Sequence, residues 1–160
     1  MRLVPTSLAL TAAAALAFLL AACGGSEPST PSACFEGAAT YEQALEAAPD
    51  EVLLAGETPI SDCFAENQGA GDLAQVGETL IETATRLDAE AREEPGGKAN
   101  VELGYLLGAA SAGAEDTQGI HENLLRRLEV TARYAPGGQT LPPAFARAYR
   151  QGFDAGREGG

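Results

Sequence analysis

The fold class is decided by residues 72–97, DLAQVGETLIETATRLDAEAREEPGG. The apolar side chains of this stretch recur every three or four residues, the spacing that places them on one face of an α-helix. They are Leu73, Val76, Leu80, Ala84, Leu87 and Ala91. Asp72 is predicted to be the N-cap, with Gln75 three residues on as in a capping box. Pro95-Gly96-Gly97 is expected to end the helix.

The rest of the chain also follows helical spacing. Further helices are predicted at about 99–115 and 117–134, the second continuing the first with little break. A last helix is predicted to start at Pro142-Pro143, with Phe145, Tyr149 and Phe153 facing inward. Upstream, a helix is predicted from Phe35 to Ala48, then a short turn of helix plus loop over 50–60 and a short helix over 61–67. The expected fold is all-α, a small bundle of about four main helices preceded by a disulfide-linked N-terminal helical segment.

Two parts of the chain echo each other. Arg86-Leu87-Asp88, Ala91-Arg92 and Pro95-Gly96-Gly97 match residues 127–129, 132–133 and 136–138 at a constant offset of 41. A Tyr-x-x-Gly follows each Pro-Gly-Gly, at Tyr105 and at Tyr149. One interpretation is a duplicated helical hairpin of roughly 41–45 residues. The other is a chance likeness of helix ends in a chain rich in Ala, Gly and Arg.

Charge limits the classes of partner. The chain has 23 acidic and 10 basic residues, a net charge of −13. Nucleic acid is therefore not an expected partner, because phosphate binding needs a basic surface. Residues 34–160 are enough for one ordinary helical domain.

The N-terminus is predicted to carry an export signal. Arg2 precedes an apolar run, Leu8–Ala22, which is shorter than the ~20 residues of a membrane-spanning helix. Leu20-Ala21-Ala22-Cys23 closes the run and is followed by Gly24-Gly25-Ser26. This stretch resembles the lipobox of bacterial lipoproteins. The alternative is an ordinary cleaved signal that happens to end in Cys.

The resemblance implies that residues 1–22 are removed and that the Cys23 thiol receives a diacylglyceryl group. It also implies an extracytoplasmic protein, lipid-anchored on the cell membrane. Residues 23–33, rich in Gly, Ser and Pro, are then a lipidated cysteine and flexible tether ahead of the domain at 34–160. The expected partners are the membrane, through the lipid on Cys23, and an envelope protein.

Cysteine number fits this interpretation. Of the three cysteines, lipidation of Cys23 leaves the pair Cys34 and Cys63. A disulfide between them is expected in an oxidising export compartment. Closing a loop of about 30 residues would stabilise the fold by roughly 3.5 kcal/mol. A metal site is the rival reading, but the chain has no Cys-x-x-Cys and a single histidine.

Glycines within the predicted helices have two interpretations. Gly104 and Gly108 lie four residues apart on one helix, as Gly152 and Gly156 do on another. Each costs about 1 kcal/mol of helix propensity relative to Ala. They could permit close helix packing, or they could open the backbone to a small ligand.

Few polar residues are candidates for ligand binding. His121 could be structural or could titrate near neutral pH beside Glu122. Arg126 and Arg127, with Arg133, Arg147, Arg150 and Arg157, could pair with the acidic first half of the chain or hold a carboxylate or phosphate. Tyr105 and Tyr149, in the two Tyr-x-x-Gly motifs, complete the candidate set.

Acid pairs at helical spacing, Glu42/Glu46 and Glu78/Glu82, are interpreted as solvated rather than as cation ligands. No catalytic residues, cofactor or metal ligands are predicted. The expected function is a non-enzymatic interaction or envelope-support domain. The alternative is binding of a small molecule or metal ion between the glycine-bearing helices.

Overall fold

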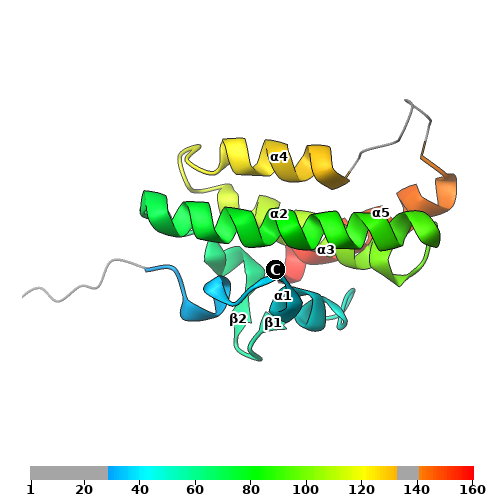
Figure 1. Ribbon diagram of the computed structural model, residues 1–160, viewed down its shortest axis with the longest axis horizontal. Helices are drawn as coiled ribbons and strands as arrows, with labels where there is room; N and C mark the ends of the chain where they lie inside the picture. Colours follow the sequence, from blue (N-terminus) through cyan, green and yellow to red (C-terminus); the bar gives the residue numbers. More distant parts are fainter. Residues whose placement is uncertain (1–28, 133–140) are drawn as a thin grey trace, which may run out of the picture.

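The computed structural model describes residues 29–132 and 141–160, and these form an all-α fold as predicted (Figure 1). The predicted signal peptide, Cys23, Arg133 and the second Pro-Gly-Gly at 136–138 lie outside the described residues. Four main helices make up the described part of the bundle: α2 (Ala70–Glu93), α3 (Lys98–Ala114), α4 (Glu122–Ala132) and α5 (Pro143–Gly159). Within the described ranges, no helix has both the length and the apolar character needed to cross a membrane.

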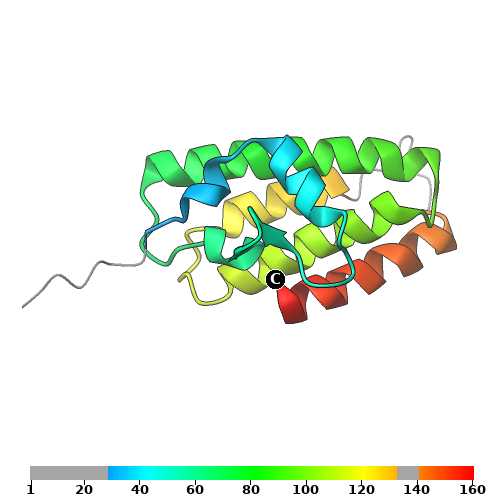
Figure 2. The same ribbon diagram turned by 90° about the horizontal axis from the view of Figure 1, so that it is seen from below.

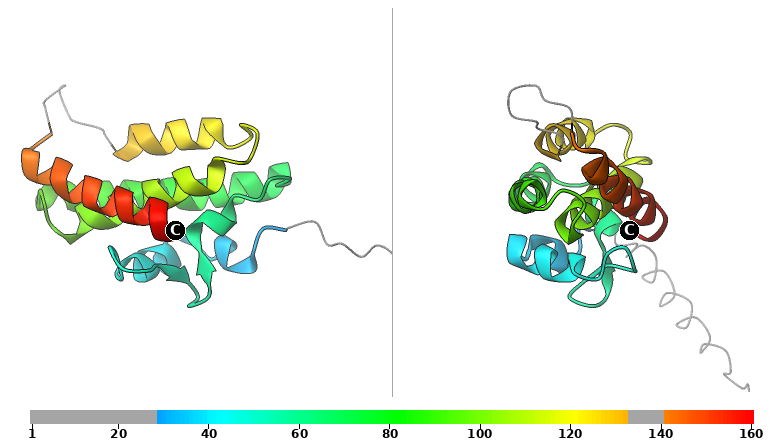
Figure 3. Two further views of the ribbon diagram at one scale, coloured as in Figure 1. Left: turned by 180° about the vertical axis from the view of Figure 1, so that it is seen from behind. Right: turned by 90° about the vertical axis from the view of Figure 1, so that its right-hand side faces the viewer.

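Helix α3 lies at the centre of the molecule. Every residue from Glu102 to Ala110 is buried, and Glu102 is the one charged residue among them, so α3 has no solvent-exposed face along this stretch. A helix that is apolar all round must be covered on all sides. It is covered by α2, α4 and α5, and by the N-terminal segment, as the end-on view in Figure 3 shows.

The N-terminal segment braces one side of the bundle. It contains the 3-10 helix η1 (Ser32–Phe35), the helix α1 (Ala38–Leu45), two short strands and a second 3-10 helix, η2 (Ile60–Cys63). Figure 2 shows it lying across α2 and α3. Thr30 and Ala33 are already buried, so the last residues of the predicted tether belong to the packed domain.

Residues 50–60 do not form the predicted turn of helix plus loop. Strands β1 (Leu53–Leu54) and β2 (Thr58–Pro59) pair antiparallel, with Leu53 opposite Pro59. Ala55 and Gly56 both have positive φ, 51° and 79°, which is the conformation that closes a tight hairpin. The short helix predicted over 61–67 is present only in part, as the 3-10 helix η2, which carries Cys63 and ends there.

Two predicted helix ends are corrected. The first long helix begins at Ala70 after Gly69, so Asp72 lies in its first turn and is not the N-cap. Its carboxylate there still favours the helix N-terminus through the helix dipole. The predicted continuity of α3 and α4 is wrong, because the chain turns between Glu115 and His121 through Gln118 and Gly119, whose φ values of 53° and 85° break the helix.

Candidate functional site

The glycine rows bring the backbones of α3 and α5 together. A Cβ on Gly104 would meet the backbone at Tyr149 and Phe153, and one on Gly152 would meet it at Val101 and Tyr105. The partner helix therefore occupies the space that a side chain would need, which confirms the close-packing interpretation. No room is left for a small molecule between these glycines, so the predicted location of a ligand site is wrong.

Tyr105 has a structural role. It is fully buried, and its hydroxyl accepts a hydrogen bond of 3.2 Å from the backbone N–H of Val52. Burial raises the pKa of Tyr105, and the bond from Val52 partly offsets the effect. The residue therefore ties the centre of α3 to the start of the hairpin.

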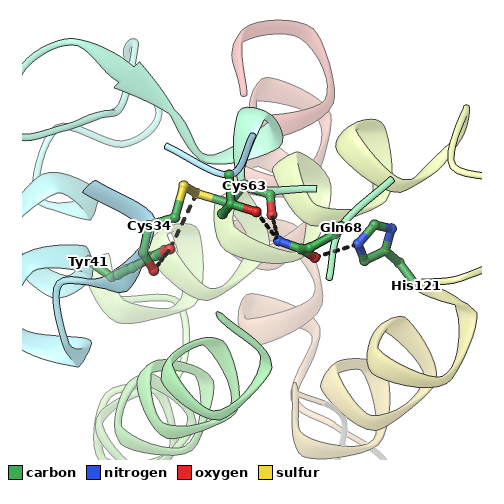
Figure 4. The surroundings of a disulfide bond; sticks show 6 residues. Cys34, Tyr41, Cys63, Gln68 and His121 are labelled. Atoms are coloured by element: carbon green, nitrogen blue, oxygen red, sulfur yellow. Dashed lines mark hydrogen bonds between the residues drawn. A yellow bond between two sulfur atoms is a disulfide. The ribbon is translucent and has the colours of Figure 1, made fainter. Parts of the chain in front are cut away.

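His121 is the end of a buried polar network around the disulfide (Figure 4). The Gln68 amide nitrogen donates to Thr30 Oγ1 at 2.8 Å and to the Cys63 carbonyl at 2.9 Å. The Gln68 oxygen consequently faces His121 Nε2, 2.8 Å away, and this nitrogen carries the proton. His121 Nδ1 is buried and has no hydrogen-bond partner among the described residues.

The environment of His121 favours the neutral ring. The side chain is fully buried, and the Phe64 ring packs edge-to-face against it at 5.1 Å between centroids. Burial lowers the pKa of His121 below its usual value. In the described part of the chain, the ring contacts the Gln68 amide and the Phe64 ring.

The disulfide is formed between Cys34 and Cys63, both completely buried, with an S–S distance of 2.01 Å. Tyr41 closes the network on its other side, where its hydroxyl donates to the Cys34 carbonyl at 3.0 Å. The predicted pairing of these two cysteines is confirmed. It joins η1, where the chain enters the domain, to η2, which packs on α3.

The predicted basic cluster is not one site. Arg126 pairs with Glu122 on its own helix, at 2.9 Å, and Arg157 pairs with Glu115. Both partners lie outside the acidic first half of the chain, so these two arginines do not make the expected pairs. Arg127 is exposed.

Tyr149 lies in a groove between α4 and α5. The groove has a volume of about 310 Å³ and is lined by apolar side chains and one cation, namely Ala132, Leu141, Phe145, Ala146, Tyr149, Phe153 and Arg150. The rings of Phe145, Tyr149 and Phe153 stack along α5, with 6.2 Å between successive centroids. Of the five predicted ligand-binding residues, Tyr149 alone lines this groove.

A second, acidic groove of about 680 Å³ lies where α1, the end of α2 and the start of α3 meet. Its carboxylates are Glu42, Glu46, Glu90, Glu93, Glu94 and Glu102. Glu102 is the buried member, and Lys98 Nζ lies 3.3 Å from its carboxylate. Burial raises the pKa of Glu102, against the opposing effect of Lys98.

Metal binding finds no support in this region. Glu42 and Glu46 line the acidic groove, but in the part of the chain described here no three carboxylate, thiol or imidazole groups come together to hold an ion. Glu82 pairs instead with Arg86, which also approaches Glu42.

Sequence reasoning missed Gln68 and Glu102, and it named Arg150 only as one member of the predicted basic cluster. Gln68 carries no local signal, because its three contacts come from distant parts of the chain. Glu102 did have a local signal in the sequence, because it is the acidic residue in an otherwise apolar helical stretch. The groove depends on how far α4 lies from α5, which the sequence pattern does not reveal.

No protein-family model, curated protein or solved structure matches the chain.

Proposed function

We propose that this protein is an exported lipoprotein, anchored to the outward face of the cell membrane by lipid on Cys23, with a non-enzymatic interaction domain. The Cys34–Cys63 disulfide is the observation that carries this proposal. It fits an oxidising compartment and engages two of the three cysteines, which leaves Cys23 as the thiol for a lipid.

The attachment point gives the domain an orientation. The chain enters the fold at Thr30, which is buried and held by Gln68. Six residues lie between it and Cys23, which limits the reach from Cys23 to Thr30 to at most about 25 Å. The end of the bundle that carries Thr30 would therefore face the membrane.

The opposite end would then be presented to partners. The end of α4 and the start of α5 lie there, away from the entry of the chain (Figure 1). These elements line the groove between α4 and α5 that contains Tyr149, here called the aromatic groove. The end of α2 lines the acidic groove. Both recessed surfaces would be accessible to an envelope protein or to a small molecule.

The state of His121 supports a non-enzymatic role. Its Nε2 is hydrogen-bonded to the side-chain amide of Gln68, and the ring is fully buried. The single histidine of the chain therefore does not serve as a general base. A small-molecule function remains the second candidate, and the aromatic groove is the observation that favours it.

Replacing the anchor residue tests the lipoprotein proposal. In cells fed an alkyne-bearing fatty acid, the native protein should take up the label and sediment with membranes. Cys23→Ser should be unlabelled and should either accumulate as the larger precursor or be released, because the thioether needs sulfur. Ser26→Ala, three residues away, is the matched control and should behave as the native protein. A Cys23→Ser protein that stays wholly membrane-bound in mature form would contradict the anchor.

A further inference from the structure

We propose that the groove between α4 and α5 binds a single-chain amphiphile that carries one negative charge, such as a medium-chain carboxylate. This inference does not depend on the anchor at Cys23. It rests on the shape of the groove, its apolar lining, and Arg150, the one cation among the described residues that line it.

The groove exists because two consecutive helices diverge. The short helix α4 packs against α2 and α3, while α5 packs mainly along α3 through its glycines. The flank of α5 beside that seam is consequently not covered by α4 along its length. Tyr149 and Phe153 remain half-buried there, although Phe145 is 3% exposed.

The apolar lining fits a hydrocarbon body. Three stacked rings form one wall, and Ala132, Leu141 and Ala146 form much of the rest. The small side chains of Ala132 and Ala146 leave the space open. A volume of about 310 Å³ is at the lower end of the range for small-molecule sites, roughly 300–1,000 Å³, which suits one short acyl chain better than a two-chain lipid.

Arg150 supplies the charge preference. It lines the groove, and within residues 29–132 and 141–160 no acidic residue lines the groove and the Arg150 guanidinium makes no ion pair. Asp154 follows one helical turn later on α5 but lies outside the lining. In a chain with a net charge of −13, a recess with a cation and no acid would select an anion. The guanidinium presents paired N–H donors that match a carboxylate.

Photolabelling can test the site on the purified full-length chain. The probe is decanoate with a diazirine in its hydrocarbon chain, and the labelled residues are located by peptide mass spectrometry. The label should fall on the lining residues of α5 and at the end of α4. Unlabelled decanoate should compete for the site at lower concentrations than decanol, because decanol lacks the charge.

Two variants probe the two halves of the site. Ala146→Leu should fill the groove and abolish labelling. Arg150→Gln should weaken decanoate competition roughly threefold to fivefold, the effect of removing one exposed ion pair. Gln151→Leu and Arg147→Gln are the matched controls, since both native residues are exposed on the same helix and neither lines the groove. Melting curves establish that all four variants are folded.

The proposal is overturned if the label appears elsewhere, or if the groove takes up none because other parts of the chain fill it. It is overturned equally if Ala146→Leu leaves the labelling unchanged. If decanol and decanoate compete alike, or if Arg150→Gln has no effect, the assignment of an anionic ligand is wrong.

Discussion

Burial of the His121 imidazole makes the stability of the fold depend on the protonation state of this ring. Gln68 Oε1 accepts a hydrogen bond from Nε2–H, and Nδ1 has no hydrogen-bond partner within the described structure. Protonation of Nδ1 would place a positive charge in a closed space beside the Phe64 ring. The folded state therefore resists protonation, whereas the unfolded chain does not.

The consequence is a loss of stability in mild acid. The unfolded chain takes up the proton near pH 6.5, and the folded chain does so only at lower pH because burial lowers the pKa of His121. Above pH 6.5 both states are neutral at this residue and its contribution is constant. Below pH 6.5 the unfolded state binds more protons, so the free energy of unfolding should fall by at most about 1.4 kcal/mol per pH unit.

His121→Gln isolates this effect, since glutamine keeps an N–H donor and cannot titrate. The difference in unfolding free energy between the native protein and this variant should be flat from pH 8 to 7 and should shrink towards pH 5. Urea melts across this range provide the measurement. Using the difference cancels Glu102, whose raised pKa acts in the opposite direction. A difference that stays constant down to pH 5 would show that His121 is not the group responsible.

At the scale of whole helices, the α3–α5 pair is a seam between two parallel backbones. The glycines on each helix face the backbone of the other in the same way, Gly104 and Gly108 against α5 and Gly152 and Gly156 against α3. The propensity cost of these four residues, about 1 kcal/mol each, is offset by close packing along the length of the seam.

A methyl group in this seam should be costly. A Cβ on Gly108 would lie 3.0 Å from the Arg157 nitrogen and closer still to the Phe153 carbonyl oxygen, so the two backbones would have to separate. We expect Gly108→Ala to lower the free energy of unfolding by about 1–3 kcal/mol despite its better helix propensity, and Gly108→Leu to lower it more. Gly71→Ala is the control, because no atom lies within 4 Å of its added Cβ and the change should be neutral or slightly stabilising. Denaturant midpoints decide the matter, and an unchanged midpoint for Gly108→Ala would rule out the tight seam.

The elements also show what sequence spacing can predict. The long helices α2, α3 and α5 are confirmed to within two residues at the ends that were predicted. The hairpin was missed because Ala55, an uncommon residue at positive φ, occupies its turn and gives no Asn-Gly signal. The break before α4 was missed for a similar reason at Gln118. In both places the rest of the fold sets a backbone conformation that the local residues do not favour.

The site was harder to predict than the elements. Tyr149 was a candidate because of a repeated motif, yet its equivalent Tyr105 is in the core. The groove arises from the divergence of α4 from α5, which depends on how each packs on α3 rather than on any pattern in their own residues. The duplicated-hairpin interpretation stays a prediction.

At the scale of the whole molecule, the N-terminal segment connects the point of attachment to the core. It makes three links: the Gln68 bonds to Thr30 and Cys63, the disulfide, and the bond from Val52 to Tyr105. The second 3-10 helix also packs its backbone at Ser61 against Gly113 of α3. A force applied to the chain near Thr30 would therefore be transmitted directly to the central helix, α3.

Of these three links the disulfide is the covalent one, and it should add to the stability of the folded domain. Cys34 and Cys63 are separated by 29 residues and both are 0% exposed, so the unreduced protein should show no reactive thiol at either position. Reduction frees the loop in the unfolded chain and should cost roughly 3.5 kcal/mol, which lowers the melting temperature by on the order of 10 °C. Calorimetry with and without reductant measures the shift. The Cys34→Ala/Cys63→Ala double variant should melt near the reduced protein and should not respond to reductant. Full labelling of both thiols in the native, unreduced protein would contradict the bond, and with it the structural support for an exported chain whose third cysteine is left for a lipid.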